Sequence, residues 1–207
     1  MGMLNAWLFS WLQEADFYIA MHAEAMKEIP VGEERTWVDI GCGPGLLTRL
    51  AAAKGYNATG IDRDPAMIRQ ARHLAGHDTK IPTFMSGEIS SVPAGEADVV
   101  SASSLLAVLD DRTGGLDQLL ALVKPGGMLI LIEATEKMNL QTAWSLVNEG
   151  HMGRRGEALL LWALARQGNT VPAELFTSRK QVALTFRPLL HELAGVWILR
   201  KEDVHHP

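Results

Sequence analysis

The apolar and polar residues of this 207-residue chain form two kinds of segment, which alternate along the sequence. Short apolar runs, several of them closed by glycine or an acidic residue, are interleaved with stretches in which apolar residues recur every three or four positions. The first pattern is typical of buried parallel strands, and the second is typical of amphipathic helices. Their alternation predicts an α/β domain with a mostly parallel sheet and helices on both faces.

The last two apolar runs, 183–190 and 195–200, predict a different kind of strand pair. Only a short connection separates them, whereas parallel neighbours need a crossover of a dozen or more residues. We therefore expect an antiparallel hairpin at the C-terminal end of the sheet. The earlier strands are expected at 37–40, 58–62, 98–102 and 128–132.

The first predicted strand runs directly into Gly41, Gly43 and Gly45. Glycine reaches positive φ, and it has no Cβ to keep a ligand away from the main chain. The spacing G-x-G-x-G differs from the G-x-G-x-x-G fingerprint of dinucleotide-binding loops. Asp39 stands just before the loop, where its negative charge disfavours a pyrophosphate and favours a cationic ligand such as a sulfonium.

With Asp39–Gly45 as its first motif, the chain resembles the class I S-adenosylmethionine-dependent methyltransferases, and in particular those that act on small molecules. The resemblance continues through Asp62, Ser86–Ile89 and the strand that ends near Ser103, and it covers about residues 35–135 before returning in the C-terminal hairpin. It implies a Rossmann-like sheet of seven strands, mostly parallel, with S-adenosyl-L-methionine as the cofactor and S-adenosyl-L-homocysteine as the product.

Asp62 follows Asp39 at close to the interval of about 20 residues that puts an acid on ribose hydroxyls in Rossmann-like units. The resemblance implies that Glu88 and Ile89 border the adenine, although Glu88 also fits an ordinary surface acid. Met67 is compatible with either an adenine contact or a buried position in the helix core. Cys42 is expected to be a small apolar side chain beside the cofactor. The predicted cofactor-binding residues are Asp39, Gly41, Cys42, Gly43, Gly45, Asp62, Arg63, Met67, Glu88, Ile89 and Ser103.

Two regions outside the common core are expected to choose the substrate. Residues 1–30 carry apolar side chains at helical spacing and predict a helical lid, and residues 136–180 predict a helical insertion between strands five and six. Within the insertion, 159–164 is apolar nearly all round, which indicates a buried helix or a homodimer contact. Tryptophans in these regions favour a partly apolar or aromatic acceptor; they are Trp7, Trp11, Trp144 and Trp162.

Three polar residues in these regions are candidates for a catalytic role. His22 and His151 are candidate general bases, because histidine titrates near neutral pH. Tyr18 is a third candidate. Arg154 and Arg155 follow His151 in a glycine-flanked connection, and they either face the substrate or form a solvated turn.

Composition supports one domain over residues 1–207, with 47% hydrophobic residues. A net charge of −5 indicates no nucleic-acid footprint, and the single cysteine excludes an intrachain disulfide and a thiolate metal site. No apolar stretch is long enough to span a membrane. No secretory signal is apparent, so we expect a cytoplasmic protein. We also expect no metal site.

The sequence therefore predicts methyl transfer from S-adenosylmethionine to a small molecule. Two other hypotheses remain open. One is a non-catalytic module that binds the cofactor or a partner protein through the same fold. The other is an oxidoreductase with a nicotinamide cofactor, against which the glycine spacing and the terminal hairpin both count.

Overall fold

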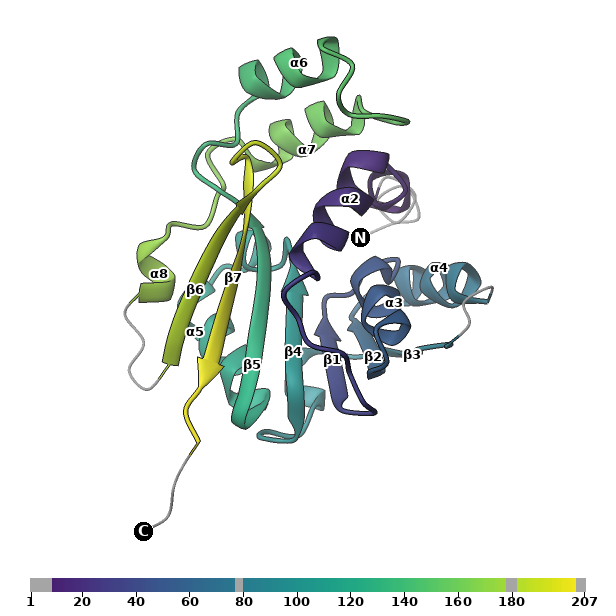
Figure 1. The fold of residues 1–207 in the computed structure, drawn as a ribbon, viewed down its shortest axis with the longest axis vertical. Coiled ribbons are helices and arrows are strands. Elements are labelled where there is room, and N and C mark those ends of the chain that lie inside the picture. Colours follow the sequence, from purple (N-terminus) through teal and green to yellow (C-terminus); the bar gives the residue numbers. More distant parts are fainter. Residues whose placement is uncertain (1–8, 77–79, 178–181, 204–207) are drawn as a thin grey trace.

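A computed structural model describes residues 9–76, 80–177 and 182–203 (Figure 1). Seven strands form one sheet in the order β3-β2-β1-β4-β5-β7-β6. The first five are parallel, β7 runs antiparallel to β5, and β6 pairs antiparallel with β7. This arrangement confirms the predicted seven-stranded sheet and its C-terminal hairpin. The strands are β1 (Thr36–Ile40), β2 (Asn57–Asp62), β3 (Thr83–Ser86), β4 (Ala97–Ser103), β5 (Val123–Ala134), β6 (Val182–Leu189) and β7 (Ala194–Lys201).

Helices connect the parallel strands and cover both faces of the sheet. They are α2 (Asp16–Ala25), α3 (Leu46–Ala53), α4 (Pro65–Ala75), α5 (Arg112–Leu122), α6 (Leu140–Asn148), α7 (Ala158–Arg166) and α8 (Glu174–Thr177), with short 3-10 turns η1 (Ile89–Ser91) and η2 (Leu106–Val108). The predicted start of α4 is confirmed: Asp64 Oδ1 accepts a hydrogen bond from the backbone N–H of Ala66, and Pro65 occupies the first helical position.

The hydrophobic core has two layers, one on each face of the sheet. Alternate residues of a strand point to opposite faces, so Trp37 and Ile130 pack with α2, α3 and α7, whereas Leu129 and Leu131 pack with α5. Strands β4 and β5 are almost wholly buried, as a parallel sheet covered on both sides requires.

Two elements differ from the sequence-based expectation. The N-terminal region is not one continuous helix: residues 9–13 are helical, the chain breaks at 14–15, and α2 follows. The predicted turn at 124–127 lies inside β5, where the pairing with β4 shifts between Ala97 and Val99. Gly126, with a φ of 72°, absorbs this irregularity.

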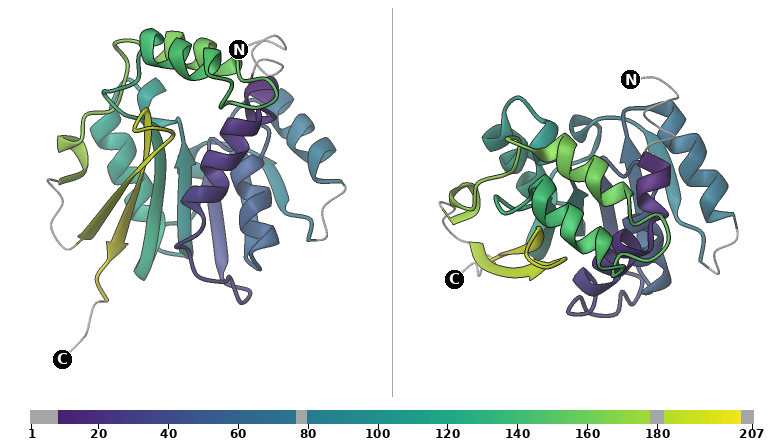
Figure 2. Two further views of the ribbon diagram at one scale, coloured as in Figure 1. Left: turned by 45° about the horizontal axis from the view of Figure 1, so that its top comes forward. Right: turned by 90° about the horizontal axis from the view of Figure 1, so that it is seen from above.

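The insertion between β5 and β6 forms α6, α7 and α8, and α6 and α7 lie across the edge where the parallel strands end (Figures 1 and 2). Helix α2 lies beside them over β1 and β4 (Figure 2). The chain turns back between β1 and β4, because β2 and β3 lie on one side of β1 and β5 lies on the other. Ligands of open α/β sheets bind at the carboxyl ends of the strands beside such a switch point.

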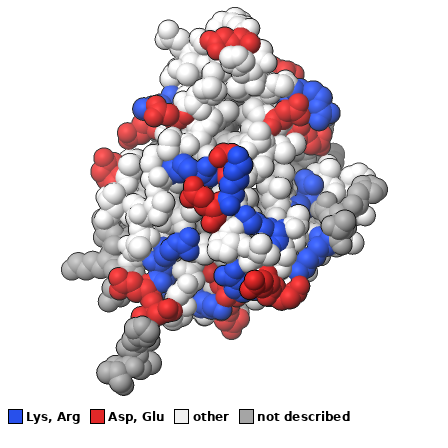
Figure 3. All heavy atoms as spheres, viewed as in Figure 1, with Lys and Arg blue, Asp and Glu red and all other residues white. Residues whose placement is uncertain are grey.

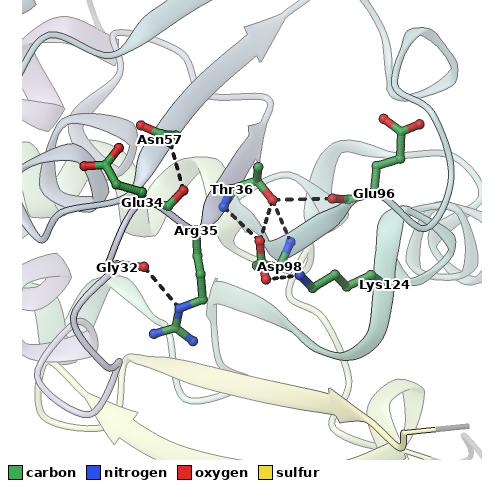
Figure 4. A network of polar contacts seen from close by, with 8 residues as sticks. All are labelled: Gly32, Glu34, Arg35, Thr36, Asn57, Glu96, Asp98 and Lys124. Carbon is green, nitrogen blue, oxygen red and sulfur yellow. Dashed lines mark hydrogen bonds and ion pairs between the residues drawn. The ribbon is translucent and has the colours of Figure 1, made fainter.

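At the opposite end of the sheet, where the parallel strands begin, Thr36, Asp98 and Lys124 form a polar clamp (Figure 4). The backbone N–H and the hydroxyl of Thr36 both donate to Oδ2 of Asp98, at 2.9 and 2.8 Å, and Lys124 forms an ion pair with Oδ1. Burial alone would raise the pKa of Asp98, but the hydrogen bonds from Lys124 and Thr36 outweigh it and lower the pKa. The clamp ties the amino-terminal ends of β1, β4 and β5 together.

Candidate functional site

The glycine loop after β1 has the backbone conformation that its sequence predicts. Gly41, Gly43 and Gly45 have φ values of 66°, 53° and 83°, a region that other residues rarely adopt. A Cβ at Gly45 would lie 2.6 Å from the ring of Phe84 on β3, so glycine is required there for packing as well. The loop therefore holds bare backbone at the carboxyl edge of β1.

Asp62 ends β2 and reaches this loop. Its Oδ2 accepts a hydrogen bond from the backbone N–H of Gly43 at 2.9 Å, and its Oδ1 accepts one from Asp64 at 2.8 Å. Each carboxylate oxygen keeps a lone pair for a further donor. The structure thus brings the predicted ribose-binding acid and the glycine loop together.

Asp39 occupies a different environment from the one predicted for a direct cofactor contact. The side chain is 1% exposed, and its two oxygens accept hydrogen bonds from Ser101 Oγ at 2.6 Å and Thr48 Oγ1 at 2.7 Å. Burial raises its pKa to about 6 even though both hydroxyl bonds lower it. Because both oxygens are engaged below the loop, Asp39 fastens β1 to β4 and α3, and we assign it a positioning role.

The remaining predicted cofactor residues surround this centre at different depths. Cys42 is buried, and burial raises the pKa of its thiol, which therefore stays protonated and unreactive. Met67 is buried on α4, whereas Arg63 and Glu88 are exposed and Ile89 is half-buried. The backbone N–H of Gly87 donates to the carbonyl of Asp62, which places residues 87–89 beside the end of β2.

Gln13 also contacts the loop, and the sequence analysis missed it. Its Oε1 accepts a hydrogen bond from the backbone N–H of Leu46, the first residue of α3, at 3.1 Å. Its Nε2 lies 3.4 Å from the place of a Cβ on Gly43. The N-terminal segment therefore lies directly on the glycine loop; the available signal was a polar residue within an apolar helical pattern.

Three predicted residues, Tyr18, His22 and Ser103, meet at the carboxyl end of β4. His22 Nδ1 lies 2.9 Å from the carbonyl of Tyr18 and must donate to it, so Nε2 accepts from the Ser103 hydroxyl at 2.9 Å. The Tyr18 hydroxyl lies 3.5 Å from the same Ser103 oxygen. Burial lowers the pKa of His22 to about 4 and raises that of Tyr18, so both are neutral at pH 7.

A second buried polar group adjoins this one and was also missed. Glu133 is at the end of β5, fully buried, and its Oε1 accepts from the backbone N–H of Leu106 at 2.8 Å. Burial raises the pKa of Glu133 to about 7. Arg166 of α7 donates from Nη2 to the carbonyl of Ser104 at 3.3 Å. An acid within the otherwise apolar run of β5 was the signal that could have found Glu133.

The structure does not bring His151 into either group. Its side chain is 60% exposed at the tip of the connection between α6 and α7, and its Nδ1 lies 3.4 Å from Glu149. Arg154 and Arg155 form ion pairs with Asp16 and Glu14 of the N-terminal segment. Both arginines therefore link two covering segments, and we do not retain His151 as a proton acceptor.

The predicted tryptophans are spread over different environments. Trp162 is 3% exposed, and its ring centroid lies 5.5 Å from that of Tyr18. Trp11 packs against the core, Trp144 is 58% exposed, and Trp7 lies outside the described residues. On α7, Leu161 and Leu164 are exposed, so this face stays available for the predicted homodimer contact.

Comparison with known families agrees with this geometry. A model of the methyltransferase domain matches residues 11–174, which is well over half of the chain. The chain belongs to the methyltransferase domain family. Two solved structures support its class I fold. The first, an S-adenosylmethionine-dependent methyltransferase from Methanococcus maripaludis, has a TM-score of 0.67 at 17% identity, with 99% of this chain and 94% of that chain covered. The magnesium protoporphyrin IX methyltransferase of Synechocystis, solved with bound S-adenosylhomocysteine, has a TM-score of 0.59 at 17% identity, with 92% and 83% covered.

Curated relatives of this methyltransferase-family chain match about half of it. It is 32% identical over 109 residues to the trans-aconitate 2-methyltransferase of Methylobacterium radiotolerans, covering 52% of this chain and 41% of that protein. It is 31% identical over 108 residues to the 2-methyl-6-phytyl-1,4-hydroquinone methyltransferase of a Synechocystis strain, covering 51% and 34%. The chain thus matches less than half the length of these relatives.

The surface is consistent with the composition. Acidic and basic side chains are interspersed on the face shown in Figure 3 rather than gathered into one basic patch. Among the described helices, none has the length and apolarity needed to cross a lipid bilayer.

Proposed function

We propose that this chain transfers a methyl group from S-adenosyl-L-methionine to a small, partly apolar or aromatic acceptor. The observation that carries the proposal is the meeting of Asp62 with the backbone of Gly43 at the switch point of the sheet. Bare backbone and a carboxylate with free lone pairs fit the ribose and methionine parts of this cofactor, and a sulfonium suits an acidic surrounding.

The cofactor supplies an electrophilic methyl group, and the protein supplies position. In this proposal the glycine loop supports the methionine part, Asp62 accepts hydrogen bonds from the ribose hydroxyls, and residues 87–89 border the adenine. Asp39 holds the loop from below. Positioning of this kind accounts for about 7–11 kcal/mol of barrier reduction in favourable cases.

In this proposal the acceptor binds between the cofactor and the two covering segments. The rings of Tyr18 and Trp162, which pack edge to face there, support a partly apolar or aromatic molecule. Relatives named for trans-aconitate and for a phytyl hydroquinone support a small acceptor. We propose residues 1–30 and 136–180 as the segments that close the site, because Gln13, Tyr18 and Trp162 come from them.

Calorimetric titration with S-adenosylhomocysteine tests the cofactor assignment. Asp62→Ala is expected to lose about 1–3 kcal/mol of binding free energy, roughly 5- to 150-fold in Kd, because two hydroxyls lose a charged partner. Asp110→Ala, at an exposed acid, is the matched control and is expected to leave Kd unchanged. Unchanged affinity in Asp62→Ala would show that the ribose is misplaced, and binding of NAD in place of the methionine cofactor would overturn the proposal.

A further inference from the structure

Four polar side chains from three separate segments converge beneath α7, next to Tyr18. Ser104 follows β4, Glu133 ends β5, and Trp162 and Arg166 come from α7; we call these four residues the acceptor cluster. They are 8%, 0%, 3% and 4% exposed. Arg166 Nη2 donates to the Ser104 carbonyl, and the Trp162 ring packs against that of Tyr18. The charges of Glu133 and Arg166 both act on the Tyr18 hydroxyl, so the cluster is continuous with the Tyr18–His22–Ser103 group.

Each member of the acceptor cluster keeps one buried polar atom without a protein partner. These atoms are Ser104 Oγ, Glu133 Oε2, Trp162 Nε1 and Arg166 Nε. A buried polar atom without a hydrogen bond destabilises the fold, and folded proteins contain few such atoms, so four around one place are unusual for packing alone. Ser104 also has a φ of 56°, a conformation that a non-glycine residue adopts at a cost. We take the four buried, unpartnered polar atoms as the evidence for a binding site.

The unpartnered atoms define the chemistry of a ligand. Trp162 Nε1 and Arg166 Nε are both N–H donors and require an acceptor oxygen. Glu133 Oε2 is an acceptor and requires an O–H or N–H. Ser104 Oγ serves either partner. A hydroxyl with a carbonyl or carboxylate oxygen on the neighbouring carbon satisfies all of them at once.

The position of the cluster places this ligand next to the proposed methyl donor. The switch point lies between β1 and β4, and Ser103 at the end of β4 pairs in register with Ile132, directly before Glu133. The glycine loop and Asp62 lie on the β1 side of the switch point, and the acceptor cluster lies on the β5 side. A molecule bound to the cluster would therefore lie across β4 from the residues proposed to hold the cofactor.

We propose that the acceptor cluster binds the methyl acceptor, that this acceptor carries a hydroxyl beside a carbonyl or carboxylate oxygen, and that Glu133 takes the hydroxyl proton. This inference rests on the proposed methyltransferase function. Arg166 and Trp162 donate to the neighbouring oxygen and orient the hydroxyl. Glu133, Trp162 and Arg166 become catalytic or specificity-determining residues that neither the family comparison nor the sequence motifs assigned.

These roles define where the proton and the electron pairs go in the reaction. Glu133 Oε2 accepts the proton of the acceptor hydroxyl, and the oxygen electron pair forms the new O–CH3 bond. The S–CH3 bond breaks, and its electron pair stays on sulfur, which becomes a neutral thioether. Glu133 then releases the proton to solvent, so the products are a methyl ether, S-adenosylhomocysteine and one proton.

Glu133 suits the task of proton acceptor better than His22 does. General bases work best when their pKa is near the working pH, and burial raises the pKa of Glu133 to about 7. His22, with a pKa of about 4, is a weaker base that orients Ser103. The other titratable and charged groups that act on Glu133 are Arg166 from α7, Arg112 from α5 and Tyr18 from α2.

Three probes separate the parts of this proposal in the full chain. After saturable binding of S-adenosylhomocysteine is established by calorimetry, methyl transfer from labelled S-adenosylmethionine is measured with 2-hydroxybenzoate, phenol and benzoate. We expect methylation of the hydroxyl oxygen of 2-hydroxybenzoate with a kcat/KM at least about tenfold above that for phenol, which corresponds to one added charge-assisted hydrogen bond. We expect no product from benzoate.

Two variants then assign the roles. Glu133→Gln keeps the size and an oxygen for the N–H of Leu106, and it is expected to lower kcat by about 10²–10⁴-fold with an unchanged Kd for S-adenosylhomocysteine. In the parent protein we expect kcat to rise with pH up to about 7, and we expect this limb to disappear in Glu133→Gln. Arg166→Gln raises KM for 2-hydroxybenzoate but not for phenol. Glu157→Gln, an exposed acid at the start of α7, is the control and changes none of these values.

Three results would overturn the inference while leaving the cofactor assignment intact. They are an unchanged kcat and pH profile in Glu133→Gln, methylation of benzoate on its carboxylate, and binding of S-adenosylhomocysteine without methylation of any probe. Failure to bind S-adenosylhomocysteine would instead overturn the proposed function itself.

Discussion

At the scale of single residues, Gly45 combines two requirements that can be separated by mutation. Its φ is 83°, and an added Cβ would lie 2.6 Å from the Phe84 ring. We predict that Gly45→Ala lowers the free energy of unfolding by about 2–4 kcal/mol, from backbone strain and from overlap with the ring. Chemical denaturation followed by circular dichroism measures the loss.

Gly95 provides the matched control for this prediction. Its φ is 73°, and no atom lies within 4 Å of the place of a Cβ, so Gly95→Ala carries the strain without the overlap. We expect Gly95→Ala to cost about 1–2 kcal/mol. Equal losses in the two variants would show that the Phe84 contact yields without cost.

Local sequence was sufficient for some site residues and insufficient for others. The glycine loop and Asp62 could be predicted because a strand, a turn and a capped helix are short-range features. The proximity of Glu133 and Arg166 could not be predicted from sequence, because only the tertiary fold brings the end of β5 near α7. For Asp39 the type of residue was informative but its direction was not, since its partners lie on β4 and α3.

At the scale of elements, the break at residues 14–15 has a structural purpose that a continuous helix would not serve. It frees the backbone N–H of Asp16 to donate to the carbonyl of Arg154, while Oδ2 of Asp16 accepts from the Arg154 backbone N–H at 2.8 Å. Arg155 pairs with Glu14 beside it. We call these contacts the latch, because they join α2 to the connection before α7.

The latch is expected to control local opening more than global stability. Its ion pairs are largely exposed, and such pairs contribute about 0–1 kcal/mol to unfolding. We predict that Arg154→Ala with Arg155→Ala shifts the unfolding free energy by no more than about 1 kcal/mol. Amide hydrogen exchange in residues 16–25 is expected to accelerate by about fivefold, because local opening needs fewer broken contacts.

Lys137→Ala is the control for the latch variant. Lys137 forms an exposed ion pair with Glu192 in a different part of the surface. Its removal is expected to leave exchange in α2 at the parent rate. If the double variant exchanges in α2 no faster than this control, the latch does not hold the two segments together.

At the scale of the whole molecule, the buried carboxyl of Asp39 links stability to pH. Its folded pKa, about 6, lies above the ordinary value of 3.8, so between these values the folded protein binds more protons than the unfolded chain. The free energy of unfolding therefore falls as pH rises through this window, by an amount on the order of 1–3 kcal/mol for this one group.

Asp39→Asn removes this titration and tests the assignment. An amide can donate to one hydroxyl and accept from the other, so the contacts with Ser101 and Thr48 are retained. We predict that the difference in unfolding free energy between the variant and the parent shifts in favour of the variant from pH 4 to pH 6.5. Urea denaturation at several pH values measures it, and a pH-independent difference would contradict the raised pKa.

The overall fold was predicted more completely than its margins. The continuous apolar run of β5 and the short connection between the last two strands left few alternative topologies. The register shift at the start of β5 was missed, because Lys124–Gly127 also fits a free turn and only pairing with β4 extends the strand. Residues 1–8 of the expected lid lie outside the described part of the chain.

The polar clamp of Thr36, Asp98 and Lys124 (Figure 4) lies at the amino-terminal ends of β1, β4 and β5. The residues proposed to meet a ligand lie at or beyond the carboxyl ends of the strands. Folding determinants and recognition determinants are thereby segregated along the strand axis. Exchange of the helices between β5 and β6 can alter which molecules are accepted without disturbing the anchorage of the sheet. New specificities are therefore accessible to this scaffold, by selection or by engineering, through changes at one end alone.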